Sequence, residues 1–222
     1  MYRKIKIENF RGINLLEFKE PKQFNLIVGE NNSCKTTVLE SIFILTGPTN
    51  PYLPLTTNVF RGFHLTTDYS WSLIFNRLNT QLPLKLYGEV IKPGEKRYLT
   101  IKPLKEKAIP KPGEISGHFV GESSGTAPID RINGLSYEYS IKKGSSKETL
   151  KFSSYIKWTG KELQRNLPED YEDSLKGIFI NANYGFSDNT RRFNNIQIKK
   201  QEGKILKILQ KIEPDIHDLS VG

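Results

Sequence analysis

The chain has 222 residues, 36% of them hydrophobic, and a formal net charge of +9 at pH 7. This length fits one domain or one and a half, and the absence of an apolar run long enough to span a bilayer excludes a helical membrane span and a membrane partner. The single cysteine excludes an internal disulfide, three scattered histidines give no metal-ligand set, and no signal peptide is apparent, so we expect a cytoplasmic protein.

The chain opens with a predicted β-hairpin. Residues 3–8 alternate, with Arg3, Ile5 and Ile7 on one side and Lys4, Lys6 and Glu8 on the other, which is typical of a half-buried strand. Residues 9–12, Asn-Phe-Arg-Gly, predict a turn, and a second strand follows through Leu15, Leu16 and Phe18. We therefore expect an antiparallel pair ahead of the next motif.

Residues 29–37, Gly-Glu-Asn-Asn-Ser-Cys-Lys-Thr-Thr, nearly match the phosphate-binding loop pattern G-x-x-x-x-G-K-[ST]. The apolar run at 24–28 predicts a strand before the loop, and the helical spacing of apolar residues at 38–45 predicts a helix after it. A strand, a glycine turn, Lys-Thr and a helix form the context that supports a nucleotide site. The alternative is an ordinary strand-to-helix turn with an exposed lysine.

The residue types suit a triphosphate. Backbone N–H groups and the positive end of the helix dipole would face the phosphates. Lys35 would place its charge on the β and γ phosphates, Thr36 would offer its hydroxyl to Mg²⁺, and Gly29 would permit the turn. The predicted nucleotide-binding set also includes the other loop residues Asn31, Asn32, Ser33, Cys34 and Thr37.

Cys34 stands where the pattern has its second glycine. Glycine allows a positive φ and a close approach of the backbone to phosphate, and cysteine makes both harder. Either the loop tolerates the side chain or nucleotide binding is weakened. A thiol beside Lys35 at a helix entrance is expected to be reactive, unless it points away from the ligand and is inert.

Residues 7–12 and 25–33, with the helix residues 37–42, resemble the start of the ABC-type ATPase heads of the SMC, RecF and OLD (overcoming lysogenization defect) group. The resemblance implies an α/β P-loop NTPase fold, the N-terminal portion of an ABC-type head, with an attached antiparallel β subdomain. It implies ATP and Mg²⁺ as cofactors, and a homodimer through the nucleotide face of a full-length protein that serves DNA repair or phage defence.

The same resemblance assigns roles to two further positions. Arg11 would approach the nucleotide, and Asn31 would lie where the signature motif of a second monomer closes over the γ-phosphate. The alternatives are a solvated turn residue for Arg11, and simple turn chemistry for Asn31 and Asn32, because asparagine tolerates left-handed conformations.

The motifs of the second half of such a head are missing. The apolar run at 177–180 is followed by Asn181 rather than Asp-Glu, and Leu135-Ser136 is followed by Tyr137 rather than by glycines. No catalytic residue is identified. We expect the N-terminal half of a longer ATPase that binds ATP but hydrolyses it slowly or not at all by itself. The alternative is a divergent small protein that binds nucleotide without hydrolysis.

The middle of the chain predicts β structure. Residues 84–90 and 97–101 bracket a Pro-Gly turn, and 135–141 and 149–152 bracket a Gly-Ser turn, so two hairpins are expected. Between them, the proline and glycine content of 103–133 predicts a long mobile loop.

The expected organisation is a partial head over the whole chain. Residues 1–50 would hold the hairpin, the loop strand and its helix, and residues 51–185 the β-rich portion. Residues 186–222 would contain a basic turn at 189–193 and an amphipathic, core-facing helix at 199–212.

The positive charge is concentrated in residues 85–111 and 188–211, each with a net charge of +5. Such clusters suggest contact with DNA, because each neutralised phosphate releases counterions. A solvated lysine-rich face would look the same. The rival reading is therefore a non-enzymatic nucleic-acid-binding or interaction protein with a degenerate phosphate loop.

Overall fold

The computed structural model describes residues 2–63, 68–91, 94–108, 129–144, 148–171, 175–180 and 186–219. The chain divides into two compact units, residues 1–179 and 180–222, and each is described by itself. The first unit contains the seven-stranded sheet and the candidate loop.

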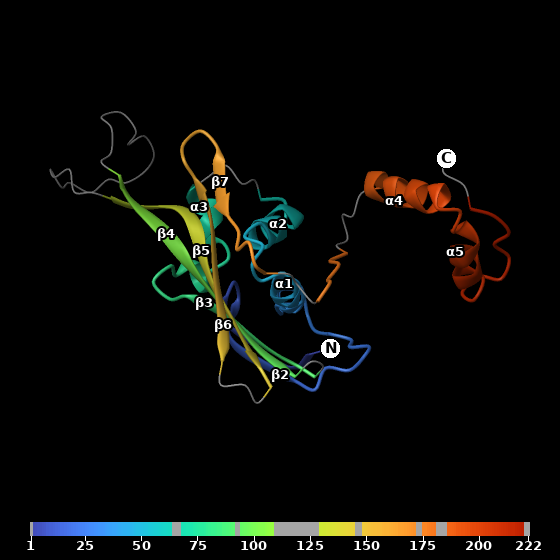
Figure 1. Ribbon diagram of the computed structural model, residues 1–222, viewed down its shortest axis with the longest axis horizontal. Helices are drawn as coiled ribbons and strands as arrows, with labels where there is room; N and C mark the ends of the chain where they lie inside the picture. The colour runs from blue at the N-terminus through green and yellow to red at the C-terminus, as the bar shows by residue number, and fades with distance from the viewer. Residues whose placement is uncertain are drawn as a thin grey trace. The chain divides into compact units, whose positions relative to one another are not determined.

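The first unit is built on one antiparallel sheet with the strand order β2-β1-β3-β4-β5-β6-β7 (Figure 1). Apart from the β1–β3 pair, neighbouring strands are consecutive in the chain, so local hairpins build most of the sheet. The strands are β1 (Tyr2–Phe10), β2 (Ile13–Lys19), β3 (Leu84–Val90), β4 (Glu95–Ala108), β5 (Ile129–Lys143), β6 (Thr149–Trp158) and β7 (Leu163–Asn166).

Alternating side chains place one face of this sheet in the core. Ile7 on β1 pairs with Leu86 on β3, which pairs with Leu99 on β4, and all three are buried. Leu84 and Ile101 form the next pair along the same face. Burial of each such side chain stabilises the fold by about 1.5–3 kcal/mol.

The predicted opening hairpin is confirmed as the antiparallel pair β1–β2.

Helices cover the apolar face of the sheet. The hydroxyl of Tyr2 donates to the carbonyl of Leu45, and that of Tyr137 donates to the carbonyl of Pro51, each at 2.9 Å. Gly88 allows the close approach, because a Cβ there would collide with the Tyr2 ring. The helices are α1 (Lys35–Thr46), α2 (Leu53–Phe60), α3 (Asp68–Ser72) and the 3-10 helix η1 (Asn76–Leu78).

The apolar run at residues 24–28 is not a strand, so this prediction is wrong for the structure described. Phe24, Leu26 and Val28 are 86%, 88% and 76% exposed. A buried strand needs neighbours that accept hydrogen bonds from its N–H groups and donate them to its C=O groups, and none of the seven strands pairs with this segment. The described residues therefore form the expected antiparallel sheet, but residues 24–28 do not form the strand of a nucleotide-binding sheet.

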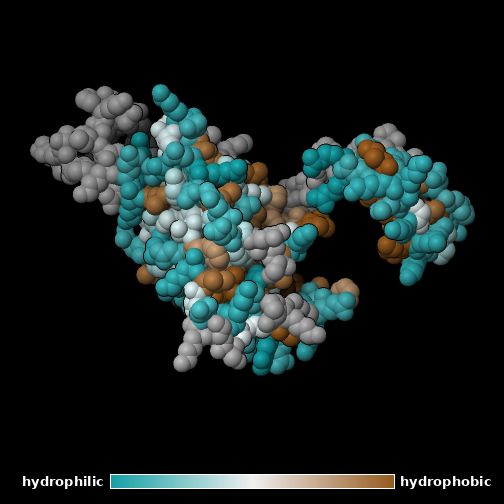
Figure 2. All heavy atoms as spheres, in the orientation of Figure 1, coloured by the Kyte–Doolittle hydropathy of each residue, from teal (hydrophilic) through white to brown (hydrophobic). Residues whose placement is uncertain are grey.

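Figure 2 shows hydrophobic side chains at the surface of the first unit among hydrophilic ones.

Both predicted hairpins in the middle of the chain are confirmed as the pairs β3–β4 and β5–β6. The predicted loop at 103–133 is too long, because β4 continues to Ala108 and β5 begins at Ile129. Pairing between these two strands outweighs the proline and glycine content at the ends of that stretch. Residues 109–128 lie outside the described residues.

The second unit contains α4 (Phe186–Ile198) and α5 (Glu202–Leu209). The predicted basic turn at 189–193 lies inside α4, so that prediction is wrong. The helix expected at 199–212 is confirmed only over α5, which follows Lys200 at a φ of +52°. Within the second unit α5 buries no residue fully, and Ile208 is 60% exposed, so the core-facing role of this helix stays a prediction. In the part of the chain that the structure describes, no helix has the length and apolar character to cross a membrane.

Candidate functional site

Residues 29–34 form a tight turn that leads into α1. Asn32 and Cys34 adopt left-handed backbone conformations, with φ of +63° and +64°. Gly29 has a φ of +155°, and a Cβ there would lie 2.7 Å from Ser33 Oγ. Asparagine adopts the left-handed region more readily than cysteine does. The turn therefore requires glycine at 29 and strains the backbone at Cys34.

Lys35 directs its ammonium group into this turn. Its Nζ donates to the carbonyl oxygens of Gly29 at 2.8 Å and Glu30 at 2.6 Å, and it lies 3.4 Å from Ser33 Oγ. These oxygens hold the Lys35 ammonium group within the loop, so its positive charge would attract an anion that enters the loop.

The start of α1 adds to this positive charge. The helix begins at Lys35 without a side-chain cap, and its first turn contains no acidic residue. The first N–H groups of a helix have no partner within the helix, and they carry the positive end of its dipole. An uncapped helix start beside an ammonium group is suited to a phosphate.

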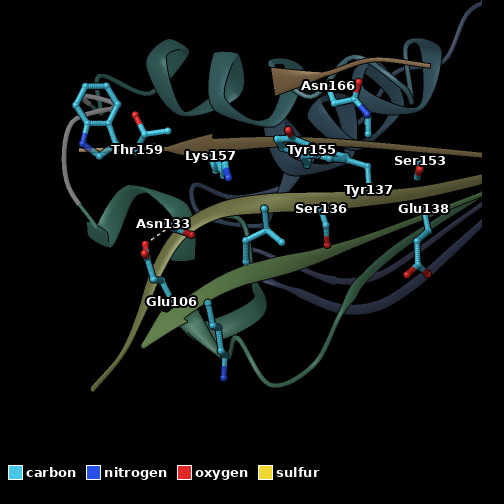
Figure 3. Close-up of a pocket in the computed structure, with 14 residues that line it drawn as sticks. Glu106, Asn133, Ser136, Tyr137, Glu138, Ser153, Tyr155, Lys157, Thr159 and Asn166 are labelled. Atoms are coloured by element: carbon cyan, nitrogen blue, oxygen red, sulfur yellow. Dashed lines mark hydrogen bonds between the residues drawn. The ribbon is translucent and has the colours of Figure 1, made fainter. Parts of the chain in front are cut away.

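The loop, the β1–β2 turn and the end of α2 together line a cavity of about 370 Å³. Of the nine predicted nucleotide-binding residues, eight line it, and Gly29 does not. The lining residues are Arg11, Gly12, Asn31, Asn32, Ser33, Cys34, Lys35, Thr36, Thr37 and Arg61. A larger hollow of about 730 Å³ lies elsewhere, along β4–β7 (Figure 3). The smaller cavity is the candidate site because a lysine, an arginine and a helix start converge there.

The two threonines of the motif have different surroundings. Thr36 is exposed and its hydroxyl makes no hydrogen bond to the described residues, so this hydroxyl is available to a cation that accompanies the phosphates. Thr37 is buried, and its Oγ1 accepts a hydrogen bond from Arg61 Nη2 at 3.1 Å. No group of three acidic, histidine or cysteine side chains within the described residues is arranged to hold a metal by itself. The site fits a Mg²⁺ that brings most of its ligands as water and phosphate.

A fully buried carboxylate lies behind the loop. Glu40 is 0% exposed, and both of its oxygens accept hydrogen bonds from Arg61, at 2.7 Å from Nε and 2.9 Å from Nη2. Arg11 Nε lies 2.9 Å from Glu40 Oε2 as an ion pair. The cluster joins the β1–β2 turn, α1 and the end of α2 through one carboxylate.

Arg11 is held inside the protein. Its Nη1 donates to the carbonyl of Leu73 at 3.2 Å, and its Nη2 donates to Thr57 Oγ1 at 2.9 Å and Asn58 Oδ1 at 2.8 Å. Burial lowers the pKa of Arg11 to about 10, and the Glu40 carboxylate opposes this shift. Arg11 therefore keeps its charge at neutral pH, directed mainly at protein oxygens.

Cys34 points its sulfur at the β1–β2 turn. A Cβ added to Gly12 would lie 2.5 Å from Cys34 Sγ, closer than two such atoms approach. Cys34 also packs against the core while it lines the cavity. The missing glycine of the motif at 34 is thus accompanied by a glycine at 12, which leaves room for the thiol.

The sequence model of the AAA ATPase domain matches residues 1–220. The chain belongs to the AAA ATPase domain family. No curated protein matches the chain significantly. Membership of the family supports nucleotide binding in general, and typically with Mg²⁺.

For an AAA ATPase domain, the acids beside the loop decide whether hydrolysis is possible. Hydrolysis needs a carboxylate that is free to orient the attacking water. Glu40 lies next to the loop, but its two oxygens are taken by Arg61 and Arg11. The geometry of this AAA ATPase domain supports anion binding and assigns no catalytic residue among the described residues.

The sequence alone did not predict a role for Glu40, and it did not predict that Arg61 lies at the loop. One signal was available for Glu40. It stands on the same helix face as Thr37 and Ile44, at the spacing of a buried stripe, and all three are buried. A carboxylate on such a stripe requires a cationic partner. The partner, Arg61, is 21 residues away in the chain, and no local pattern identifies it.

Proposed function

We propose that this AAA ATPase domain binds ATP at residues 29–37, with Mg²⁺ held through the Thr36 hydroxyl. The observation that carries the proposal is the Lys35 ammonium group, held within the loop at the uncapped start of α1 beside a cavity of about 370 Å³. A triphosphate would receive N–H groups from the loop and a full positive charge from Lys35. The family supports nucleotide binding in general; adenine is inferred from the resemblance alone.

Lys35→Ala tests this proposal. We expect the unmodified chain to bind Mg-ATP in a calorimetric titration, and Lys35→Ala to weaken binding by at least about tenfold, because one charge-assisted contact to phosphate is lost. The matched control is Lys22→Ala, since Lys22 is 75% exposed and pairs only loosely with Glu20 at 3.8 Å. Equal affinities for Lys35→Ala and the unmodified chain would show that the loop is not the site.

The subgroup is a separate proposal. We infer that the chain is the N-terminal half of an SMC, RecF or OLD-like ATPase head whose nucleotide sheet is completed by strands outside these residues. The exposed apolar run at 24–28 supports this, since it has the composition of a buried strand but no partner strand among the described residues. Ile178 and Ile180, at 71% and 76% exposure, are a second such run.

Three further properties of such an assembly are inferred from the resemblance alone. The full-length protein would form a homodimer that closes over the nucleotide. It would hydrolyse ATP with an acidic residue from the second half of the head, and it would serve DNA repair or phage defence. By itself, the chain is proposed to bind ATP rather than to turn it over, because Glu40 is held by two arginines.

A second candidate function is contact with nucleic acid on the face of the sheet opposite the one that α1, α2 and α3 cover. The register of β3–β6 brings three tyrosines and an excess of lysines to this face. The lysines are Lys85, Lys96, Lys102, Lys142, Lys151 and Lys157, against Glu89 and Glu138. The Tyr87 and Tyr98 rings lie 4.9 Å apart, and Lys157 lies 5.8 Å from the Tyr155 ring.

The larger hollow follows this face. Ser136 pairs with Tyr155, which pairs with Asn166, and all three line the hollow that Figure 3 draws. Lysines that contact phosphates, beside tyrosines on which bases stack, are the means by which sheet surfaces bind single strands. This observation favours single-stranded DNA or RNA over a protein partner.

The test is the salt dependence of binding to a labelled oligonucleotide. We expect the double variant Lys85→Gln, Lys151→Gln to reduce the slope of log K against log salt by about one to two, because each lysine accounts for about one phosphate contact. A matched double variant of Lys22 and Lys176, two exposed lysines outside the strands of the sheet, should leave the slope unchanged. Equal slopes for the two double variants would remove this face from the proposal.

A further inference from the structure

Arg61 is the arginine that a ligand in the candidate cavity can reach. It follows α2 as its C-cap and lines the same cavity as Lys35. Its side chain is 32% exposed, whereas the side chain of Arg11 is 8% exposed. The resemblance to ATPase heads singles out Arg11, but the contacts of the two guanidinium groups favour Arg61.

The difference lies in their unused donors. All three nitrogens of Arg11 lie against protein oxygens, in Glu40, Leu73 and the α2 side chains. Arg61 uses Nε and Nη2 for Glu40 and Thr37, and its Nη1 has no hydrogen-bond partner among the described residues. A guanidinium group with a free edge and a fixed orientation is suited to a phosphate oxygen.

The net charge of the cluster of Glu40, Arg11 and Arg61 also favours Arg61 as the residue that meets a ligand. Glu40 balances one of its two arginines, so a net positive charge remains, and Arg11 is the buried member. The uncompensated charge is therefore presented to the cavity through Arg61, beside the charge of Lys35. The hydrogen bond from Arg61 to Thr37 Oγ1 places this guanidinium next to the residue that follows Thr36.

We propose that Arg61 contacts the terminal phosphate of the nucleotide, and that Glu40 positions Arg61 for this contact while Arg11 anchors Glu40 from the protein interior. The proposal rests on ATP binding at residues 29–37. The terminal phosphate is chosen because Thr37, which Arg61 contacts, adjoins Thr36, the residue that would hold a Mg²⁺ and so bring its charge to the terminal phosphates.

The test compares Mg-ATP and Mg-ADP in calorimetric titrations of Arg61→Gln. We expect the affinity for ATP to fall by about tenfold and that for ADP by less than about twofold, because one charge-assisted hydrogen bond to the γ-phosphate is lost. Arg3→Gln is the matched control, since the Arg3 side chain is 68% exposed and its nearest acid lies 3.9 Å away. Its affinities for both nucleotides should match those of the unmodified chain.

A purely structural role for Arg61 would lower both affinities together, or neither, and either result overturns the proposal. If Arg61→Gln does not fold, as judged by circular dichroism, Arg61→Lys replaces it. The lysine keeps the charge but loses the paired hydrogen bonds to Glu40. The affinity of Arg61→Lys for ATP should therefore also fall, while its affinity for ADP should not. Failure of ATP binding itself would instead appear as a null titration of the unmodified chain, or as full affinity in Lys35→Ala, and would overturn both proposals.

Discussion

Glu40→Gln is expected to lower the free energy of unfolding by about 3–5 kcal/mol, the largest stability change that we predict for this chain. The Glu40 side chain is 0% exposed and lies within 2.9 Å of a nitrogen of both Arg11 and Arg61. Glutamine fills the same space but leaves two like charges facing each other without a counterion, and Arg11, whose side chain is only 8% exposed, has little access to water. Urea unfolding followed by circular dichroism measures the loss.

The same substitution at the surface is the control. Glu138 pairs with Lys102 at 2.6 Å, but the two side chains are 62% and 47% exposed. Glu138→Gln should therefore change the free energy of unfolding by no more than about 1 kcal/mol. If the two variants lose the same stability, the buried cluster does not hold the loop region together.

The position of the cluster explains why this loss would also affect the candidate site. Domains of this kind have a total stability of about 5–15 kcal/mol, so the expected loss is a large fraction of it. Glu40 contacts the β1–β2 turn through Arg11 and the end of α2 through Arg61. Both of these residues, like Lys35, line the cavity. The shape of the nucleotide pocket and the stability of the first unit thus depend on the same carboxylate.

Local patterns in the sequence predicted the parts of the fold that local contacts build. The opening hairpin and the β3–β4 hairpin alternate apolar and polar residues around a turn, and both are present. The start of α1 was also predicted, because Lys35 and the residues before it form a motif whose geometry is set within nine residues. The eight predicted residues that line the cavity come from this motif and from Arg11.

The rest depends on contacts between distant residues. The run at 24–28 has the composition of a strand, but its state is decided by partner strands, and the described residues supply none. The basic stretch at 189–193 looked like a turn because of its polarity, whereas neighbouring residues on both sides continue it as α4. The pairing of Glu40 with Arg61 joins α1 to the residue that follows α2, and neither segment alone indicates it.

The second large effect that we predict concerns the thiol that replaces the motif glycine. Gly12→Ala should lower the free energy of unfolding by about 1–3 kcal/mol, because its Cβ would meet Cys34 Sγ at 2.5 Å in a packed region. The backbone of Gly12 does not have a positive φ, so the methyl group and not the main chain would cause this loss. Chemical unfolding of the single variant measures it.

Cys34→Gly should suppress that loss. Removal of the sulfur opens the space that the new methyl group needs, and glycine relieves the strain of a φ of +64°, worth about 1 kcal/mol. In a double-mutant cycle, Gly12→Ala should then lower stability by less than about 0.5 kcal/mol in the Cys34→Gly background. Cys34→Gly should also bind Mg-ATP more tightly than the unmodified chain, because its backbone can approach the phosphates more closely. If Gly12→Ala lowers stability equally in both backgrounds, the sulfur does not fill the space beside Gly12, and the need for glycine at 12 does not depend on the thiol at 34.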